Sequence, residues 1–128
     1  MASLLAERKG VRLAYVFGST ARGDRKGDSD IDLAVLFDVS PSANEQLVLR
    51  ETLGAAAGIS VDLIDLNAAS PLLAHEVVRE GKAIVAHGDD ERAAFELRTI
   101  AKYLDTVHLR NVQLGYFRER ARARAHAG

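Results

Sequence analysis

The sequence predicts a single α+β domain, α/β-like in its alternation, with four strands in one mixed sheet flanked by helices. Three observations carry this prediction. The chain has 128 residues, the length of one typical domain. Hydrophobic residues make up 48% of it, which is enough for a core. Short β-branched runs alternate with segments of helical periodicity. We therefore expect residues 1–128 to form one domain that ends in a long helix over 89–126.

The first half of the chain predicts a short helix and then two neighbouring strands. The opening segment ends at Gly10, a residue typical of helix C-caps. Residues 11–17 (VRLAYVF) and 31–37 (IDLAVLF) are apolar and rich in β-branched and aromatic residues, which predicts buried strands. Between them, 18–30 is rich in glycine, charge and hydroxyl groups and predicts a loop, with room for one helical turn after Ser19. A connection of this length suits two adjacent strands with a functional loop at their end.

Helix caps and strand runs alternate in the second half. Ser42 and Glu45 have the spacing of a capping box. Ser70 is an N-cap followed by Pro71 at the first helical position. The other expected boundaries are helix ends at Gly58 and Gly81, strands over 59–66 and 82–87, and a last helix that starts at Asp89 or Asp90.

Composition excludes several classes of protein. The 17 Lys and Arg nearly balance the 18 Asp and Glu, for a net charge of −1, so direct nucleic-acid binding through bulk positive charge is not expected. The absence of cysteine excludes disulfides and thiolate zinc sites. No apolar stretch approaches the ~20 residues of a membrane span, and the first residues do not form a signal peptide. We expect a cytoplasmic protein without a membrane partner.

Charge is unevenly distributed along this nearly neutral chain. Residues 118–126 (RERARARAH) carry a net charge of +3, whereas 1–117 hold 13 bases and 17 acids, a net −4. The basic run suits a solvated helix end, and contact with RNA or an acidic partner is the alternative. Four acids fall within nine positions, at Asp24, Asp28, Asp30 and Asp32.

Asp30 and Asp32 flank Ile31 at the start of the second predicted strand. Because strand side chains alternate between faces, both carboxylates point to the same side. Adjacent carboxylates repel each other, and Mg²⁺ accounts for the pair because it takes oxygen ligands. Gly18 and Ser19, at the end of the preceding strand, suit close backbone approach and phosphate binding. The spacing predicts a metal dyad beside a phosphate-binding turn, the layout for metal-assisted nucleotidyl transfer.

This run resembles the signature of the DNA-polymerase-β-like nucleotidyltransferase superfamily. Gly18 and Ser19 are followed by a ten-residue spacer over 20–29, with ARG at 21–23 and SDIDL at 29–33. In these features it is similar to the minimal nucleotidyltransferases (MNT), and more closely to the MntA-type antitoxins of HEPN/MNT toxin–antitoxin pairs. The resemblance covers nearly the whole chain and implies a polymerase-β-like fold.

The resemblance also assigns roles to residues. It implies that Asp30 and Asp32 bind metal, with two Mg²⁺ ions expected, and that Arg22 joins Gly18 and Ser19 in binding the nucleotide. It implies a third acid on a later strand, which we assign to Asp62, as the carboxylate that accepts the proton of the nucleophile and helps to bind metal. Its competitor is Asp65, which falls on the opposite strand face. Asp24 and Asp28 are interpreted as turn residues.

The function implied by the resemblance is AMP transfer from ATP to a tyrosine of a cognate HEPN RNase toxin, with release of pyrophosphate and neutralisation of the toxin. A hetero-oligomer with that toxin is expected. Two alternatives stay open. One is an antidote that neutralises by binding alone, and the other is a small-molecule nucleotidyltransferase completed by a helical partner chain.

The last predicted helix is apolar around most of its circumference, which favours a protein partner. The residues concerned are Leu104, Val107, Leu109, Val112, Leu114, Tyr116 and Phe117.

Overall fold

The computed structural model describes residues 2–18 and 30–127, with side chains up to residue 122. Its centre is one four-stranded sheet in the order β3-β2-β1-β4. The strands are β1 (Val11–Phe17), β2 (Ile31–Phe37), β3 (Val61–Asp65) and β4 (Lys82–Ala86). β1 pairs antiparallel with β2 and β4, whereas β2 and β3 are parallel. The predicted mixed sheet is confirmed.

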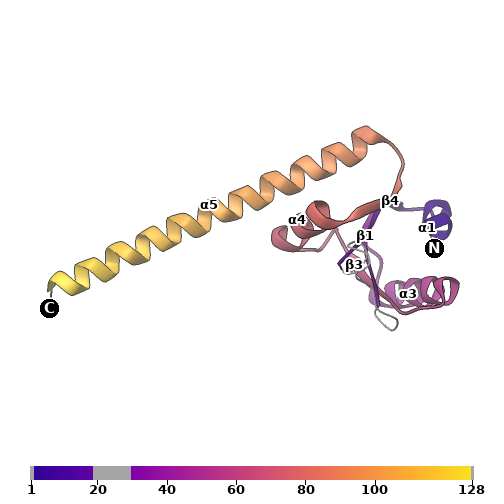
Figure 1. Cartoon of the computed structure of the whole chain (residues 1–128), viewed down its shortest axis with the longest axis horizontal. Coiled ribbons are helices and arrows are strands. Elements are labelled where there is room, and N and C mark those ends of the chain that lie inside the picture. The colour runs from indigo at the N-terminus through magenta and orange to yellow at the C-terminus, as the bar shows by residue number, and fades with distance from the viewer. Residues whose placement is uncertain (1, 19–29, 128) are drawn as a thin grey trace.

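Helices cover both faces of this sheet (Figure 1). They are α1 (Ala2–Glu7), α3 (Ala43–Ala57), α4 (Pro71–Glu80) and α5 (Asp89–Ala127). On one face, Leu5 of α1 and Leu53 of α3 pack against Leu33 and other strand residues. On the other face, Val77 of α4 and Phe95 of α5 pack against strand residues such as Ala34, Leu36 and Tyr15. The two clusters form the core.

The helix caps follow the prediction. The Ser42 hydroxyl accepts the Glu45 N–H, while the Glu45 carboxylate accepts the Ser42 N–H, completing the capping box. The Ser70 hydroxyl accepts the Leu73 N–H at the start of α4. Gly58 ends α3 in the left-handed conformation at φ +70°.

Several boundaries differ from those expected, among them the end of β3 at Asp65 rather than residue 66 and the end of α5 at Ala127 rather than residue 126. α1 ends at Glu7, and Gly10, at φ +88°, lies in the turn before β1. β3 begins two residues later than 59 because the Ile59 N–H is donated to the Gly54 carbonyl at the end of α3. β4 stops at Ala86 rather than at residue 87. The differences lie at element ends, where assignments are least fixed.

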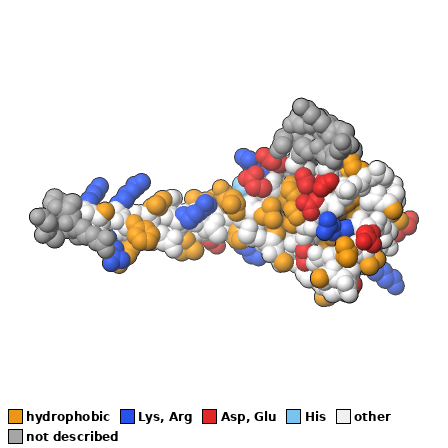
Figure 2. Space-filling view, turned by 90° about the horizontal axis from the view of Figure 1, so that it is seen from below, with side chains coloured by type: hydrophobic (Ala, Val, Ile, Leu, Met, Phe, Trp, Pro, Cys, Tyr) orange, Lys and Arg blue, Asp and Glu red, His pale blue; other side chains and the backbone are white. Residues whose placement is uncertain are grey.

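α5 begins on the domain and then extends away from it (Figure 1). Phe95 and Thr99 are buried against the body. The buried Tyr15 hydroxyl donates to Glu96 at 3.0 Å, which ties α5 to the middle of the sheet. Beyond Val107 the described side chains are exposed apart from a half-buried Gly115, and hydrophobic side chains lie open along the projecting length (Figure 2).

Within residues 2–18 and 30–127, no helix, α5 included, combines the length and the apolar character needed to cross a bilayer.

Candidate active site

Three aspartates gather at one end of the sheet, where β2 and β3 begin. Asp32 of β2 is the register partner of Asp62 of β3. The Ile31 N–H donates to the Ser60 carbonyl at 2.9 Å, which fixes this parallel register. Asp30 directly precedes β2, two residues from Asp32, and so shares its side of the strand. These carboxylates occupy the sheet face that α4 and α5 cover further along, because Ile31 belongs to the core cluster on the opposite face.

Gly18 faces this group from the end of β1. Phe17 pairs with Asp32 across the β1–β2 ladder, and the chain then turns at Gly18 with φ +71°. A Cβ atom at position 18 would collide with the Asp32 Oδ2 atom. Both the backbone conformation and the close carboxylate therefore require glycine.

Burial and neighbouring like charges shape the electrostatics of the site. Partial burial raises the pKa of the Asp32 carboxyl above its ordinary value, and the negative charges of Asp62 and then Asp30 raise it further. Over the part of the chain that the structure describes, no hydrogen bond or ion pair to another side chain offsets these three charges. A cation at this edge of the sheet would relieve the repulsion.

The donor chemistry fits Mg²⁺ in an open site. Carboxylate oxygens are its preferred protein ligands, and it is usually held by one or two of them together with substrate phosphates. Among the described residues, no three His, Asp or Glu side chains enclose a metal ion by themselves. The arrangement therefore suits a metal that enters with a phosphate-bearing substrate better than a closed structural metal site.

The structure brings together four of the predicted site residues, namely Gly18, Asp30, Asp32 and Asp62. Ser19 and Arg22, predicted to bind the nucleotide, and Asp24 and Asp28, predicted to be turn residues, lie outside the described residues.

Asp65, the rejected candidate, is three residues from Asp62 on the other face of β3. Its carboxylate accepts the Asn67 N–H at 2.9 Å. The Asn67 side chain in turn bonds both the N–H and the carbonyl of Phe37, at the end of β2. Asp65 therefore shapes the turn after β3.

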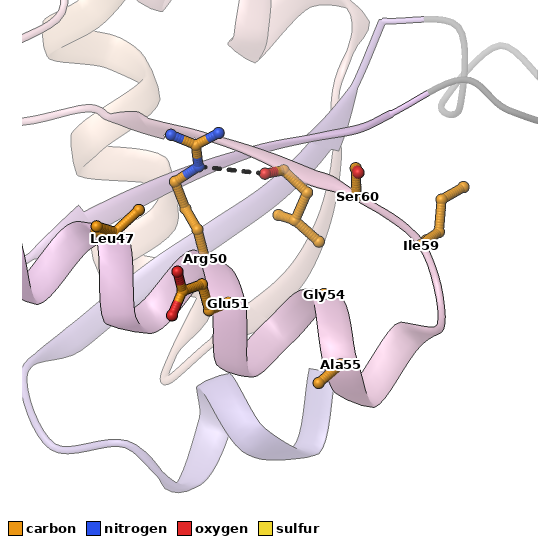
Figure 3. A pocket seen from close by; sticks show the side chains of 8 residues that line it. Leu47, Arg50, Glu51, Gly54, Ala55, Ile59 and Ser60 are labelled. Atoms are coloured by element: carbon orange, nitrogen blue, oxygen red, sulfur yellow. Dashed lines mark hydrogen bonds between the residues drawn. The ribbon is translucent and has the colours of Figure 1, made fainter.

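Arg50 is a supporting residue that the sequence did not indicate. Its Nε donates to the Val61 carbonyl at 3.3 Å, so a side chain of α3 holds the outer edge of β3 one residue before Asp62 (Figure 3). The two residues border an open hollow of about 400 Å³ on the α3 side of the sheet. Arg50 is exposed on its helix, and nothing in its spacing distinguishes it from an ordinary solvated arginine.

A mixed sheet with two aspartates at the start of one strand, a third on its parallel neighbour and a glycine turn facing them defines a nucleotidyltransferase site. The family described as "Polymerase beta, Nucleotidyltransferase" matches residues 1–90. The chain is 32% identical over 118 residues to protein adenylyltransferase MntA of Shewanella oneidensis, an alignment that covers 92% of this chain and 84% of that protein. It is 43% identical over 76 residues to the MntA of Thermococcus cleftensis, covering 59% of this chain and 77% of the relative.

Matches to solved structures point to the same family as these relatives. A crystal structure of a toxin–antitoxin with AMP-PNP matches with a TM-score of 0.76 at 30% identity, over 86% of this chain and 88% of that one. A structure of a tri-AMPylated Shewanella oneidensis HEPN toxin in complex with an MNT antitoxin contains a chain that matches with a TM-score of 0.69 at 26% identity. The match covers 91% of this chain and 98% of that one. The chain therefore belongs to the polymerase β nucleotidyltransferase family, within its MntA-type protein adenylyltransferases.

Proposed function

We propose that this protein is an antitoxin that transfers AMP from ATP to a tyrosine of a cognate HEPN RNase toxin and so neutralises it. The observation that carries the proposal is the set of three mutually repelling aspartates facing Gly18. Neutralisation by contact alone needs no such arrangement. The relatives support the choice of acceptor, because they are named protein adenylyltransferases and one solved relative is bound to a tri-AMPylated HEPN toxin.

In this proposal Gly18, Ser19 and Arg22 bind the phosphates of ATP. Gly18 leaves room for the ligand to approach the backbone beside Asp32. Asp30 and Asp32 would hold two Mg²⁺ ions, with Asp62 helping. When bound, the ions neutralise the triphosphate and stabilise the pyrophosphate that leaves.

Asp62 is proposed as the general base. The tyrosine oxygen of the toxin forms a bond to the α-phosphorus of ATP, and its proton passes to the Asp62 carboxylate. The bond between the α-phosphorus and its bridging oxygen breaks, and pyrophosphate leaves. Asp62 suits this role because it is exposed at the edge strand, whereas Asp32 is half-buried beside it.

We further propose that residues 1–128 act as one domain and that α5 carries the toxin-binding surface. The half of α5 beyond Val107 presents an exposed apolar face at Leu109, Val112 and Tyr116. Exposed apolar faces of this kind mark protein interaction sites. The result would be a hetero-oligomer of antitoxin and toxin. Because the proposed reaction takes AMP from ATP, we expect the protein to act in the cytoplasm.

Co-expression with the toxin tests the proposal. Intact mass spectrometry of the toxin should show a gain of one or more AMP units, and the gain should disappear with Asp30→Asn and Asp32→Asn combined. The matched control is Asp65→Asn, which removes one carboxylate from the same sheet outside the proposed site. Neutralisation of a toxin with unchanged mass would replace the proposal with the contact-only antidote.

A further inference from the structure

α5 carries a heptad seam that the domain itself does not use. The residues of this seam follow one another at alternating intervals of three and four residues, which is the a/d pattern of a coiled coil. The six seam residues are Leu97, Ile100, Leu104, Val107, Asn111 and Leu114. Five are apolar, and the sixth, Asn111, falls at an a position, where a single polar residue sets register at some cost in stability.

The seam lies next to the face of α5 that packs on the domain. The domain itself does not cover it. Phe95 and Thr99 point inward and are buried, and Tyr103 stacks on His75 of α4 with ring centroids 3.7 Å apart. Leu97 and Leu114, at the two ends of the seam, are 68% and 53% exposed. Figure 2 shows hydrophobic side chains following one another along this helix. The seam therefore runs from the part of α5 on the domain into the part that projects.

We propose that the seam pairs antiparallel with the same seam of a second copy of this chain. Antiparallel helices pack a positions against d positions. The seam is symmetric about its middle, so Leu97 would face Leu114 of the second copy. Ile100 would face its Asn111. Leu104 would face its Val107, and each layer would occur twice.

The charges at the two ends of α5 favour this orientation. The first turn is acidic, with Asp89, Asp90 and Glu91, and the distal end carries Arg118, Arg120 and Arg122. In the same register the basic end of α5 around Arg122 would lie level with the acidic first turn of the second copy around Asp89. A parallel pair would instead place like charges together at both ends.

The projecting half of α5 also needs support that its own domain does not give. Helices in proteins owe most of their stability to packing of an apolar face, and isolated short helices are marginal in water. Residues 108–122 have almost no buried side chains. The second copy would pack along this half from Val107 to Leu114.

The pairing leaves the proposed toxin-binding face free. Leu109, Val112 and Tyr116 occupy f and b positions of the same heptads, on the side of α5 away from the seam. A dimer of antitoxin chains would thus display two such faces. The inference does not rest on AMP transfer, because a chain without transferase activity would retain the seam.

Site-specific crosslinking tests both the interface and its orientation. The chain has no cysteine, so introduced thiols report only on themselves. A mixture of the Leu97→Cys and Leu114→Cys variants should form a disulfide between the two, seen as a doubled mass on a non-reducing gel. Leu109→Cys is the matched control, exposed on the same helix outside the seam, and should not crosslink to Leu97→Cys. Crosslinking of Leu97→Cys to itself would show a parallel pair and overturn the proposal.

Light scattering of the purified full chain gives the second readout. The expected mass is twice the 13.8 kDa of one chain. Leu104 is exposed in the single chain, so Leu104→Arg should leave the fold intact. It should weaken dimerisation about tenfold or more because it buries an unpaired charge. Arg122→Glu should weaken it less, and adding Asp89→Lys should restore it. A monomeric wild-type chain, or a seam that only the toxin protects from thiol labelling, would overturn the proposal.

Discussion

The carboxylate of Asp32 occupies the place where any side chain at position 18 would begin. Gly18 and Asp32 come from the facing ends of β1 and β2, and the Oδ2 atom lies within collision distance of a Cβ built on Gly18. Gly18 and the Asp32 carboxylate are thus in close contact. The glycine allows the strand that we propose binds metal and the turn that we propose binds phosphate to meet.

Gly18→Ala should therefore abolish most of the transferase activity. The new methyl group would push the Asp32 carboxylate aside, and misplacement of a catalytic group by about 1 Å can cost about 10²-fold in rate. The left-handed conformation would add about 1–2 kcal/mol of strain. AMP transfer to the purified toxin, followed by intact mass, measures the first effect, and urea unfolding measures the second.

Gly10→Ala is the matched control. Gly10 has φ +88°, and a Cβ there would meet nothing within 4 Å. Its substitution should cost a similar 1–2 kcal/mol of stability (about the price of a left-handed alanine) and leave the transfer rate unchanged. Equal losses of activity in the two variants would mean that strain, and not contact with Asp32, explains the requirement for glycine at 18.

A second prediction separates the two acids of β3. Asp62→Asn should remove transfer almost completely, by about 10²-fold or more, because the proposed base is lost while the shape is kept. Asp65→Asn should keep the transfer rate and lower stability by about 1 kcal/mol, since it weakens the bond to the Asn67 N–H. Comparable activity in both variants would contradict the assignment of Asp62.

The sequence predicted the elements and most of the candidate site because these depend on local chemistry. Ser42 and Ser70 cap helices through atoms three residues away. The alternation of side chains along a strand is enough to place Asp62 and Asp65 on opposite faces. Asp30 and Asp32 likewise follow from two positions on one strand.

What the sequence could not predict depends on contacts between distant segments. Arg50 meets Val61 only because α3 packs beside the edge of β3, and its exposed position on the helix gives no sign of this. The order β3-β2-β1-β4 is likewise a property of the packed sheet. The closeness of Gly18 to Asp32 depends on the register of β1 and β2, which the length of the 13-residue connection between them does not determine.

A third prediction concerns the stability cost of the acidic site. The folded chain raises the pKa of Asp32 above its ordinary value of 3.8, so the folded state disfavours the charged form. Stability should fall as the pH rises from 3.8 through the raised pKa and stay lowered above it. Asp32→Asn should therefore raise the Tm at pH 7 in the presence of a chelator, and the gain should vanish below pH 3.8.

Magnesium and nucleotide should reverse the order of the Tm values of the wild-type chain and Asp32→Asn. A ligand that binds only the folded state raises its apparent stability. Mg²⁺ with a non-hydrolysable ATP analogue should raise the Tm of the wild-type chain and have little effect on Asp32→Asn. Calorimetric scans with and without chelator give both comparisons, and an equal rise in the two proteins would argue against Asp32 as a ligand.

The last prediction concerns Tyr15, which anchors α5 to the sheet. Burial raises the pKa of its hydroxyl well above the ordinary 10.0, and the hydrogen bond to Glu96 and the negative charge of Glu96 raise it further. The folded state therefore keeps this proton at pH values where the unfolded chain releases it. Stability should decline as the pH rises above 10.0, by up to about 1.4 kcal/mol per pH unit.

The stability difference between Tyr15→Phe and the wild-type chain should depend on pH. At pH 8 it should be less stable than the wild-type chain by about 1–2 kcal/mol, because a hydrogen bond to a charged acceptor is lost. Glu96 would keep its bond to Arg92 at 2.9 Å, so no carboxylate is left without a partner. Above pH 10.0 the variant escapes the titration of Tyr15, and the gap should narrow with each pH unit. Urea unfolding at pH 8, 10 and 11 measures the gap, and a constant difference across the series would show that Tyr15 ionises equally in both states.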